Sequence, residues 1–461
     1  TKLTESFSFP SGYFSGGLGM TKYFLAVDIG ASSGRHIIGW LNNGRVCLEE
    51  IYRFSNYMDV VDGSLVWDTK RIFSEILAGM RRCAEIGKIP QSMSIDTWGV
   101  DFILLDREGA LLGPAVTYRD KRTSKMDQEL DKEMLPEELY SRTGIASYTY
   151  NTVYQLLALK KNSPELLANA DALLMTPDYY QYLLTGKRIQ EYTMATTTQL
   201  VNAHTGVWDE DIIERMGIPV YIFQKIRRPG FALGDLKQEI RESVGYSCKV
   251  VLCASHDTAS AVMTIPEKGA FFISSGTWSI VGMKTDQSIA SESARRGGFT
   301  NEGGDSGYYF ARNIMGLWMI QSVRKEYGDQ LTYDEIATLA AKETLTSIVD
   351  CMDEAFLAPA SMTEAVREAC RKTGQEIPEG LPQLAWVIYN SLAKCYGDTI
   401  REIERVTSCV REDVFIMGGG SLSSILCDLT AKYSRKRIIP ASVEATAEGN
   451  IVSQMRYAGM K

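Results

Sequence analysis

Two segments, far apart in the chain, repeat one local pattern in which a turn rich in Gly, Ser and Thr lies between apolar strands. The first is FLAVDIGASSGRHIIGW, from Phe24, and the second is AFFISSGTWSIVGMK, from Ala270. Apolar runs interrupted by such turns predict β-hairpins. Identity between the segments is low, so the likeness is one of pattern. It predicts two related sheet domains facing each other across a cleft, each offering one turn to the same ligand.

The length of the chain supports two domains. At 461 residues it exceeds the size at which a single hydrophobic core usually keeps growing. Pro266 and Gly269 interrupt the pattern, so we place the boundary between an N-terminal domain, 20–265, and a C-terminal domain, 266–461. Residues 1–19 lack the basic and apolar regions of a secretory signal, and we treat them as a leader or an added extension.

The order of the expected elements indicates the fold class. From Tyr23, three strands joined by short turns predict an antiparallel meander, and a helical pattern follows over 68–86. Strands QSMSID and VDFILLD come next, helical segments dominate 122–210, and strand CKVVLCAS follows. This mixture of hairpins and helices predicts an α/β protein with mixed sheets.

Composition and charge exclude several classes of function. The chain is 45% hydrophobic and 23% charged, which is typical of a folded globular protein. A net charge of -8 disfavours a nucleic-acid or anionic-membrane partner. There is no apolar run long enough to span a membrane, so we expect a cytoplasmic location. With three histidines and no CxxC pair, there is little material for a zinc site.

The first turn is rich in hydrogen-bond donors. Its backbone N–H groups, two hydroxyls and one guanidinium suit phosphate oxygens, and they belong to Gly30, Ala31, Ser32, Ser33, Gly34 and Arg35. Asp28 adds a carboxylate that suits a hydrated Mg²⁺. A plain hairpin turn explains the segment equally well. It also fits the GxSxG pattern of serine hydrolases, but that motif needs a helix directly after it, and here a strand-like run follows.

Two further glycine-rich loops could contact a nucleotide, although no GxxxxGK[ST] motif occurs. The second turn contains Gly276 and Thr277, and it too could be a simple hairpin. Strand DVFIMGGGS brings Gly418, Gly419 and Gly420 before a helix expected to begin near Ser421. Three glycines allow close approach of the backbone to a planar ring or a phosphate, whereas a tight turn needs only one.

One carboxylate is a candidate for acid–base chemistry. After strand KVVLCA come Ser255, His256, Asp257 and Thr258, and then a run of small residues suited to the start of a helix. A carboxylate between a strand end and a helix is well placed at the edge where α/β proteins bind ligands. The alternative, in which Asp257 only caps the helix, is the commoner role for such residues.

Taken together, these segments resemble the FGGY carbohydrate kinases of the actin-like ATPase superfamily, over nearly the whole chain from Tyr23. They are most similar to the subgroup that acts on L-rhamnulose, at nine ordered blocks: VDIGASSGR, IDTWGVDF, YRD, ASHDTASAV, SSGTWS, TNEGG, NIMGLW, GGGS and VEATAEGN. Many members of the family have Gly-His-Asp where this chain has Ser-His-Asp, a departure that still matches the L-rhamnulose subgroup.

The resemblance implies two RNase-H-like domains flanking a central cleft, and it implies roles for the motif residues. Asp257 would be the catalytic base, and Asp28 would hold Mg²⁺ through water. The nucleotide phosphates would lie against 30–35 with Gly276 and Thr277, and the adenosine against 418–420. The ketose would be contacted by Trp98, Gly99, His256, Asp257, Thr258 and Asn301.

The resemblance further implies a kinase that uses ATP and Mg²⁺ to phosphorylate the primary hydroxyl of a ketose, L-rhamnulose first, with L-fuculose or L-xylulose as alternatives. The methyl group of a 6-deoxy ketose needs an apolar contact, for which Trp98, Phe102 and Trp278 are candidates. A non-catalytic, actin-like nucleotide-binding protein and a hydrolase using Ser32 remain alternatives. Expected partners are small molecules only, for a monomer or homodimer.

Overall fold

The computed structural model describes residues 3–5, 21–265, 268–357 and 359–460. Of the predicted leader, only 3–5 are described, as a short strand, and Pro266 lies outside the described residues. Backbone contacts divide the chain into two units: the first comprises 1–264, 286–309 and 446–461, and the second 265–285 and 310–445. Both contain sheets and helices, which confirms the predicted two-domain α/β class with mixed sheets.

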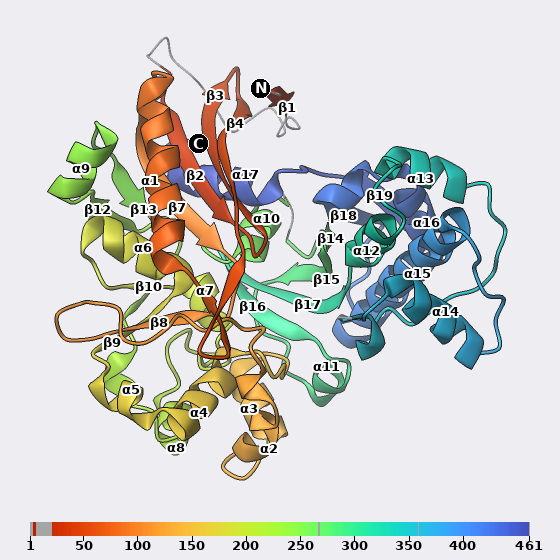
Figure 1. Cartoon of the computed structure of the whole chain (residues 1–461), viewed down its shortest axis with the longest axis horizontal. Coiled ribbons are helices and arrows are strands. Elements are labelled where there is room, and N and C mark those ends of the chain that lie inside the picture. Colours follow the sequence, from red (N-terminus) through yellow and green to blue (C-terminus); the bar gives the residue numbers. More distant parts are fainter. Residues whose placement is uncertain (1–2, 6–20, 266–267, 358, 461) are drawn as a thin grey trace. The chain divides into compact units, whose positions relative to one another are not determined.

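Among the described residues, the strands of the main sheet of the first unit lie in the order β1-β4-β3-β2-β7-β13-β12 (Figure 1). The bounds of the strands in this unit are β1 Leu3–Glu5, β2 Tyr23–Ile29, β3 Ser33–Asn42, β4 Arg45–Ser55, β5 Met58–Val61, β6 Ser64–Trp67, β7 Pro90–Thr97, β8 Phe102–Leu105, β9 Ala172–Met175, β10 Gln190–Glu191, β11 Ile226–Arg227, β12 Ala232–Asp235, β13 Lys249–Val251 and β16 Thr300–Gly304. Strands β2, β3 and β4 pair antiparallel, as the predicted meander requires. Strands β2, β7 and β13 are parallel neighbours, so their carboxyl ends share one edge.

Some helices of the first unit cover this sheet with their apolar side chains, and others form a second core with β8 and β9. The bounds of the helices are α1 Thr69–Glu85, α2 Met126–Leu130, α3 Pro136–Thr143, α4 Thr152–Asn162, α5 Pro164–Asn169, α6 Thr176–Thr185, α7 Tyr192–Thr196, α8 Glu210–Arg215, α9 Gln238–Val244, α10 Asp257–Met263, α11 Glu292–Arg296 and α17 Ala445–Tyr457. Asp68 caps the N-terminus of α1, where its side chain accepts from the backbone N–H of Arg71. Its buried residues Ile72, Ile76 and Met80, one turn apart, join the core with β2 and β7.

The second unit is built on neighbouring strands in the order β17-β15-β14-β18-β19. Its elements are β14 Phe271–Ser275, β15 Trp278–Thr285, β17 Gly307–Met315 (which begins in the first unit), α12 Trp318–Glu326, α13 Tyr333–Ala340, α14 Met362–Lys372, α15 Leu381–Thr407, β18 Asp413–Met417, α16 Ser424–Ser434 and β19 Arg437–Pro440. The helix expected near Ser421 begins only at Ser424, because the glycine segment first forms a short 3-10 turn over Gly419–Leu422. In the described part of the chain, no helix combines the length and apolarity needed to cross a membrane.

The core of the first unit contains a histidine that should make its stability depend on pH. His36 on β3 is fully buried, and burial lowers its pKa from 6.5 to about 4, although a hydrogen bond with the carbonyl of Ile76 opposes this. Because the unfolded chain binds this proton more readily, the contribution of neutral His36 to the free energy of unfolding is fully present above pH 6.5. It decreases as the pH drops toward 4. We expect a loss of about 3 kcal/mol from this residue.

The variant His36→Gln should reduce the slope of unfolding free energy against pH in that window, measured by urea unfolding at several pH values. The comparison is between slopes, so a constant loss of packing in the variant does not matter. A slope identical to that of the wild type would show that His36 is not the group responsible.

Candidate active site

Three neighbouring parallel strands carry predicted residues to one edge of the first sheet. Asp28 near the end of β2 pairs in register with Asp96 on β7. Thr97 on β7 forms a parallel bridge with His256, which follows β13, and its N–H donates to the carbonyl of Ser255 at 2.9 Å. Ligands of open α/β sheets bind at this carboxyl edge. The fold therefore brings Asp28 and the segment from His256 to Thr258 together.

The predicted phosphate turn of the first unit is a tight hairpin. The N–H of Gly30 donates to the carbonyl of Ser33 at 2.8 Å, and the side chain of Asn56 donates to the carbonyl of Gly30 at 2.9 Å. The Arg35 guanidinium donates to one carboxylate oxygen of Asp28, from Nε at 3.0 Å and from Nη2 at 2.8 Å. In this conformation Arg35, which was predicted to bind phosphate, neutralises Asp28, which was predicted to hold Mg²⁺.

Asp257 is the first residue of α10, and its carboxylate is partly open to solvent, with 35% of the side chain exposed. One oxygen accepts from the backbone N–H of Thr258 at 2.6 Å and from its hydroxyl at 3.3 Å. Burial raises the pKa of Asp257, as does the nearby Asp28 carboxylate, while His256 lowers it. A partly buried carboxylate with a raised pKa that is still reached by solvent is suited to accepting a proton.

Two of the residues predicted to contact the sugar lie beside this carboxylate. His256 Nε2 is 3.4 Å from Asp257 Oδ1, and a Cβ added to Gly99 would lie 3.3 Å from the same nitrogen. Trp98, by contrast, is buried: its ring packs on Trp67 at a centroid distance of 4.3 Å, and its N–H donates to Asp101. The contact predicted for Trp98 is therefore limited to the small part of its surface that is exposed.

Asn301 on β16 is also buried, and backbone groups occupy its amide. Its Nδ2 donates to the carbonyls of Gly144 at 2.9 Å and Ile289 at 3.1 Å, and its Oδ1 accepts from the N–H of Ile289 at 2.6 Å. The side chain thus ties two loops together. A sugar could hydrogen-bond to this side chain only through bonding capacity that these three hydrogen bonds leave unused.

Asp96 is a carboxylate of this edge that the sequence reasoning did not single out. It is fully buried, and its Oδ2 accepts from the Asn450 side chain at 2.6 Å, while Oδ1 has no hydrogen-bond partner among the described residues. Burial and repulsion from Asp28 and Asp257 hold its pKa well above the usual range. The parallel register of β2 and β7 was the signal that could have found it.

The acidic residues at this edge fit a divalent cation that arrives with other ligands. The Asp28 carboxylate raises the pKa of both Asp96 and Asp257, because like charges disfavour the ionised forms of their neighbours. In the described residues, no three His, Cys, Asp or Glu side chains are arranged to hold a metal ion. The donors are carboxylates, which suit a hydrated Mg²⁺ whose remaining ligands are water and phosphate.

In the second unit, the two predicted nucleotide loops lie against each other. The N–H of Gly276 donates to the carbonyl of Trp278 at 2.9 Å, closing the turn between β14 and β15. Gly418 has a φ of +78°, and a Cβ there would lie 2.9 Å from the carbonyl oxygen of Ser275. At Gly420 a Cβ would lie 2.1 Å from the Ser275 hydroxyl. Glycine is therefore required at 418 and 420, where the loop 418–420 packs against Ser275 in the turn region that contains Gly276.

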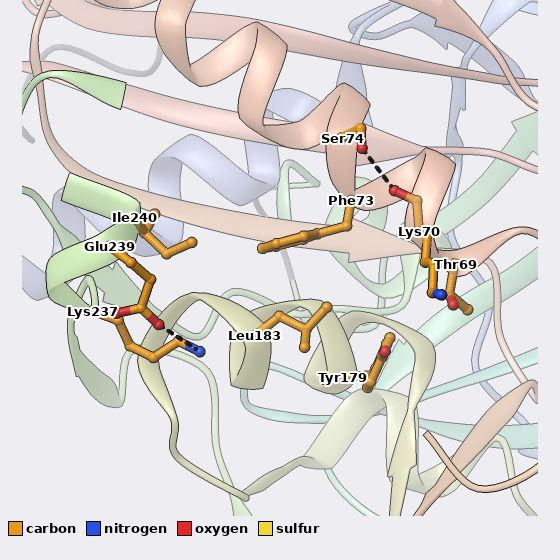
Figure 2. Close-up of a pocket in the computed structure, with 9 residues that line it drawn as sticks. All are labelled: Thr69, Lys70, Phe73, Ser74, Tyr179, Leu183, Lys237, Glu239 and Ile240. Atoms are coloured by element: carbon orange, nitrogen blue, oxygen red, sulfur yellow. Dashed lines mark hydrogen bonds and ion pairs between the residues drawn. The ribbon is translucent and has the colours of Figure 1, made fainter. Parts of the chain in front are cut away.

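The first unit also has a cavity of about 430 Å³ between α1, α6 and α9 (Figure 2). It is lined by Thr69, Lys70, Phe73, Ser74, Tyr179, Leu183, Lys237, Glu239 and Ile240. Lys237 pairs with Glu239 across 3.2 Å, and the Ser74 hydroxyl donates to the carbonyl of Lys70 at 3.0 Å (Figure 2). None of the residues predicted for nucleotide or sugar lines this cavity.

Comparison with known proteins shows that both halves of the chain match domains of one protein family. Residues 23–264 match the N-terminal domain of the FGGY family of carbohydrate kinases, and 271–458 match its C-terminal domain. A rhamnulokinase from Oceanobacillus iheyensis is 44% identical over 433 residues, which cover 94% of this chain and 92% of the relative. One from Halalkalibacterium halodurans is 43% identical, covering 95% of this chain and 94% of the relative.

Solved structures agree on the fold. A xylulose kinase from Lactobacillus acidophilus superposes with a TM-score of 0.78 at 17% identity, covering 95% of this chain and 90% of that one. A glycerol kinase from Plasmodium falciparum, solved with ADP, superposes with a TM-score of 0.76 at 15% identity and the same coverage. With both domains matched and a close sequence relationship over nearly its full length, the chain belongs to the FGGY family of carbohydrate kinases.

Proposed function

We propose that this carbohydrate kinase transfers the γ-phosphoryl group of MgATP to the primary hydroxyl of L-rhamnulose, giving L-rhamnulose 1-phosphate. The observation that carries the chemistry is Asp257, a partly exposed carboxylate at the carboxyl edge of the sheet, whose pKa is raised by burial and by the charge of Asp28. The choice of sugar is supported by the relatives called rhamnulokinase, which are up to 44% identical to this chain.

In the proposed reaction, Asp257 accepts the proton of the primary hydroxyl as that oxygen bonds to the γ-phosphorus. The bond from this phosphorus to the bridging oxygen breaks, and ADP leaves. Phosphoryl transfer needs mainly positioning and neutralisation of charge. The raised pKa of Asp257 makes it a stronger base than an ordinary carboxylate, provided that the pH is high enough to ionise it.

The remaining roles are assigned by motif. Phosphate oxygens would be bound by the turn 30–35 with Gly276 and Thr277, and the adenosine by 418–420. The ketose would be surrounded by Trp98, Gly99, His256, Thr258 and Asn301. Mg²⁺ would be held near Asp28 through water, where it would neutralise phosphate charge. We further propose that the enzyme acts in the cytoplasm as a monomer or homodimer, which cell fractionation and light scattering can test.

The test is ADP release with MgATP against L-rhamnulose, L-fuculose, L-xylulose, L-ribulose, D-xylulose and glycerol. We expect the highest kcat/KM with L-rhamnulose. Preference for another ketose would keep the kinase activity and overturn the proposed substrate. ATP binding without stimulation by any of these sugars would instead indicate a nucleotide-binding protein whose Asp257 performs no phosphoryl transfer.

A further inference from the structure

The imidazole of His256 is held on one side by two residues outside the segment that contains Asp257. Its Nδ1 lies 2.9 Å from the hydroxyl oxygen of Tyr309 and 3.0 Å from Glu302 Oε2. Its Nε2 lies beside Asp257 and Gly99, as described above. Nδ1 is therefore committed to Tyr309 and Glu302, and Nε2 is the nitrogen that faces Asp257 and Gly99.

The hydrogen bonds around Nδ1 determine where the proton lies. The Tyr309 hydroxyl donates its single hydrogen to Glu302 Oε2 at 2.5 Å, so toward His256 its oxygen can only accept. An ionised Glu302 carboxylate can also only accept. Both partners of Nδ1 are thus acceptors, which requires a hydrogen on Nδ1.

Electrostatics favour the doubly protonated ring. Burial by itself lowers the pKa of His256, but Coulomb attraction and the hydrogen bond to Glu302, with smaller contributions from Asp257 and Glu191, raise it overall. Burial raises the pKa of Glu302, but His256 and the Tyr309 hydroxyl lower it overall. The two shifts agree, since each favours the charged form of its group, and the 3.0 Å contact between His256 Nδ1 and Glu302 Oε2 has the geometry of an ion pair.

We propose that Glu302, itself held by Tyr309, is a positioning residue that keeps His256 as an imidazolium whose Nε2–H is directed to an oxygen of the ketose beside Asp257. This role rests on the proposed sugar kinase activity. The same imidazolium stabilises the ionised form of Asp257, since His256 lowers the pKa of that carboxyl. Glu302 thereby acts on the base through the histidine without contacting the substrate.

The variant Glu302→Gln tests this role, because glutamine has the shape of glutamate without its charge. We expect kcat/KM for the ketose to fall by roughly 10- to 100-fold, on the scale of the loss that follows removal of the carboxylate partner from a metal-bound histidine. Loss of the carboxylate favours the neutral ring, so the alkaline limb of the pH profile should move to lower pH. Asp257 loses a neighbouring cation, so the acidic limb should move to higher pH.

A direct readout does not depend on catalysis. The chain has three histidines, so isotope labelling at histidine Cε1 gives three NMR signals, and variants of His36 and His204 assign them. In the enzyme without ligands, Glu302→Gln should lower the titration midpoint of His256 by roughly one pH unit or more. Tyr309→Phe, which keeps the charge pair but removes one acceptor, should lower it by less.

The matched control is Glu292→Gln, which removes an exposed carboxylate of the same unit that pairs with Arg295 and Arg296. It should move neither the His256 signal nor the pH profile. An unchanged His256 midpoint in Glu302→Gln, or a pH profile that is scaled down without moving, would overturn the proposal. If Glu302→Gln does not fold, the midpoint in Tyr309→Phe decides in the same way. Failure of the wild type to phosphorylate any ketose would instead refute the proposed function, since the NMR titration needs no turnover.

Discussion

Replacing Asp257 with Asn should lower sugar-stimulated ADP release by about 10²- to 10⁴-fold, the range expected when a general base is removed. The amide keeps the size of the carboxylate and can still accept from the N–H of Thr258, so α10 should begin at the same residue. It cannot take the proton of the sugar hydroxyl. Binding of ATP should be retained, because the turn 30–35 and the loops of the second unit are unchanged.

The measurement is coupled ADP release over a range of pH, with the Asp235→Asn variant as the control. Asp235 is an exposed carboxylate of the same unit, paired with Lys249 at 2.8 Å, and its loss should leave the rate unchanged. Because the pKa of Asp257 is raised, the wild-type rate should fall as the pH drops through that pKa, and the Asn variant should lack this limb. A variant with the wild-type rate would mean that another group, or none, accepts the proton.

Replacing Gly449 with Ala should destabilise the protein by about 3 kcal/mol, at the upper end of the usual cost of overpacking. Gly449 on α17 touches α10: an added Cβ would lie 1.8 Å from the carbonyl oxygen of Ser260 and 2.6 Å from its carbonyl carbon. These are backbone atoms, which cannot rotate away as a side chain would. The two helices must therefore separate, and the Ser260 hydroxyl should lose its bond to the carbonyl of Thr446.

Urea unfolding measures this change, with Gly380→Ala as the control, since a Cβ there meets only Pro382 Cδ at an ordinary 3.7 Å. We also expect lower activity in the Gly449 variant at temperatures where it is still folded. The reason is that α10 begins with Asp257, and α17 carries Asn450, the hydrogen-bond partner of Asp96. Equal stability of the variant and the wild type would show that the helices are farther apart than described.

Local patterns were sufficient for most elements around the site. The expected helix over 68–86 is α1, Thr69–Glu85, and the meander after Tyr23 is β2, β3 and β4. Their boundaries depend on neighbours in sequence: the side chain of Asp68, the Asn-Gly turn before β4 and the alternation of apolar residues. The start of α16 was predicted less accurately. Three consecutive glycines can adopt many backbone conformations, and local propensity does not favour one of them.

Patterns in the sequence predicted the turns, the strands that flank them, the position of Asp257 at the start of a helix and, through the ordered motifs, the family. Only the tertiary structure placed 286–309 and 446–461 in the first unit, set Asp96 between Asn450 and the other acidic residues, and brought Glu302 to His256. The difference lies in how far apart along the chain the interacting residues are. A turn or a cap is made by residues a few positions apart, whereas the buried polar contacts join segments far apart in the chain, so no local period records them.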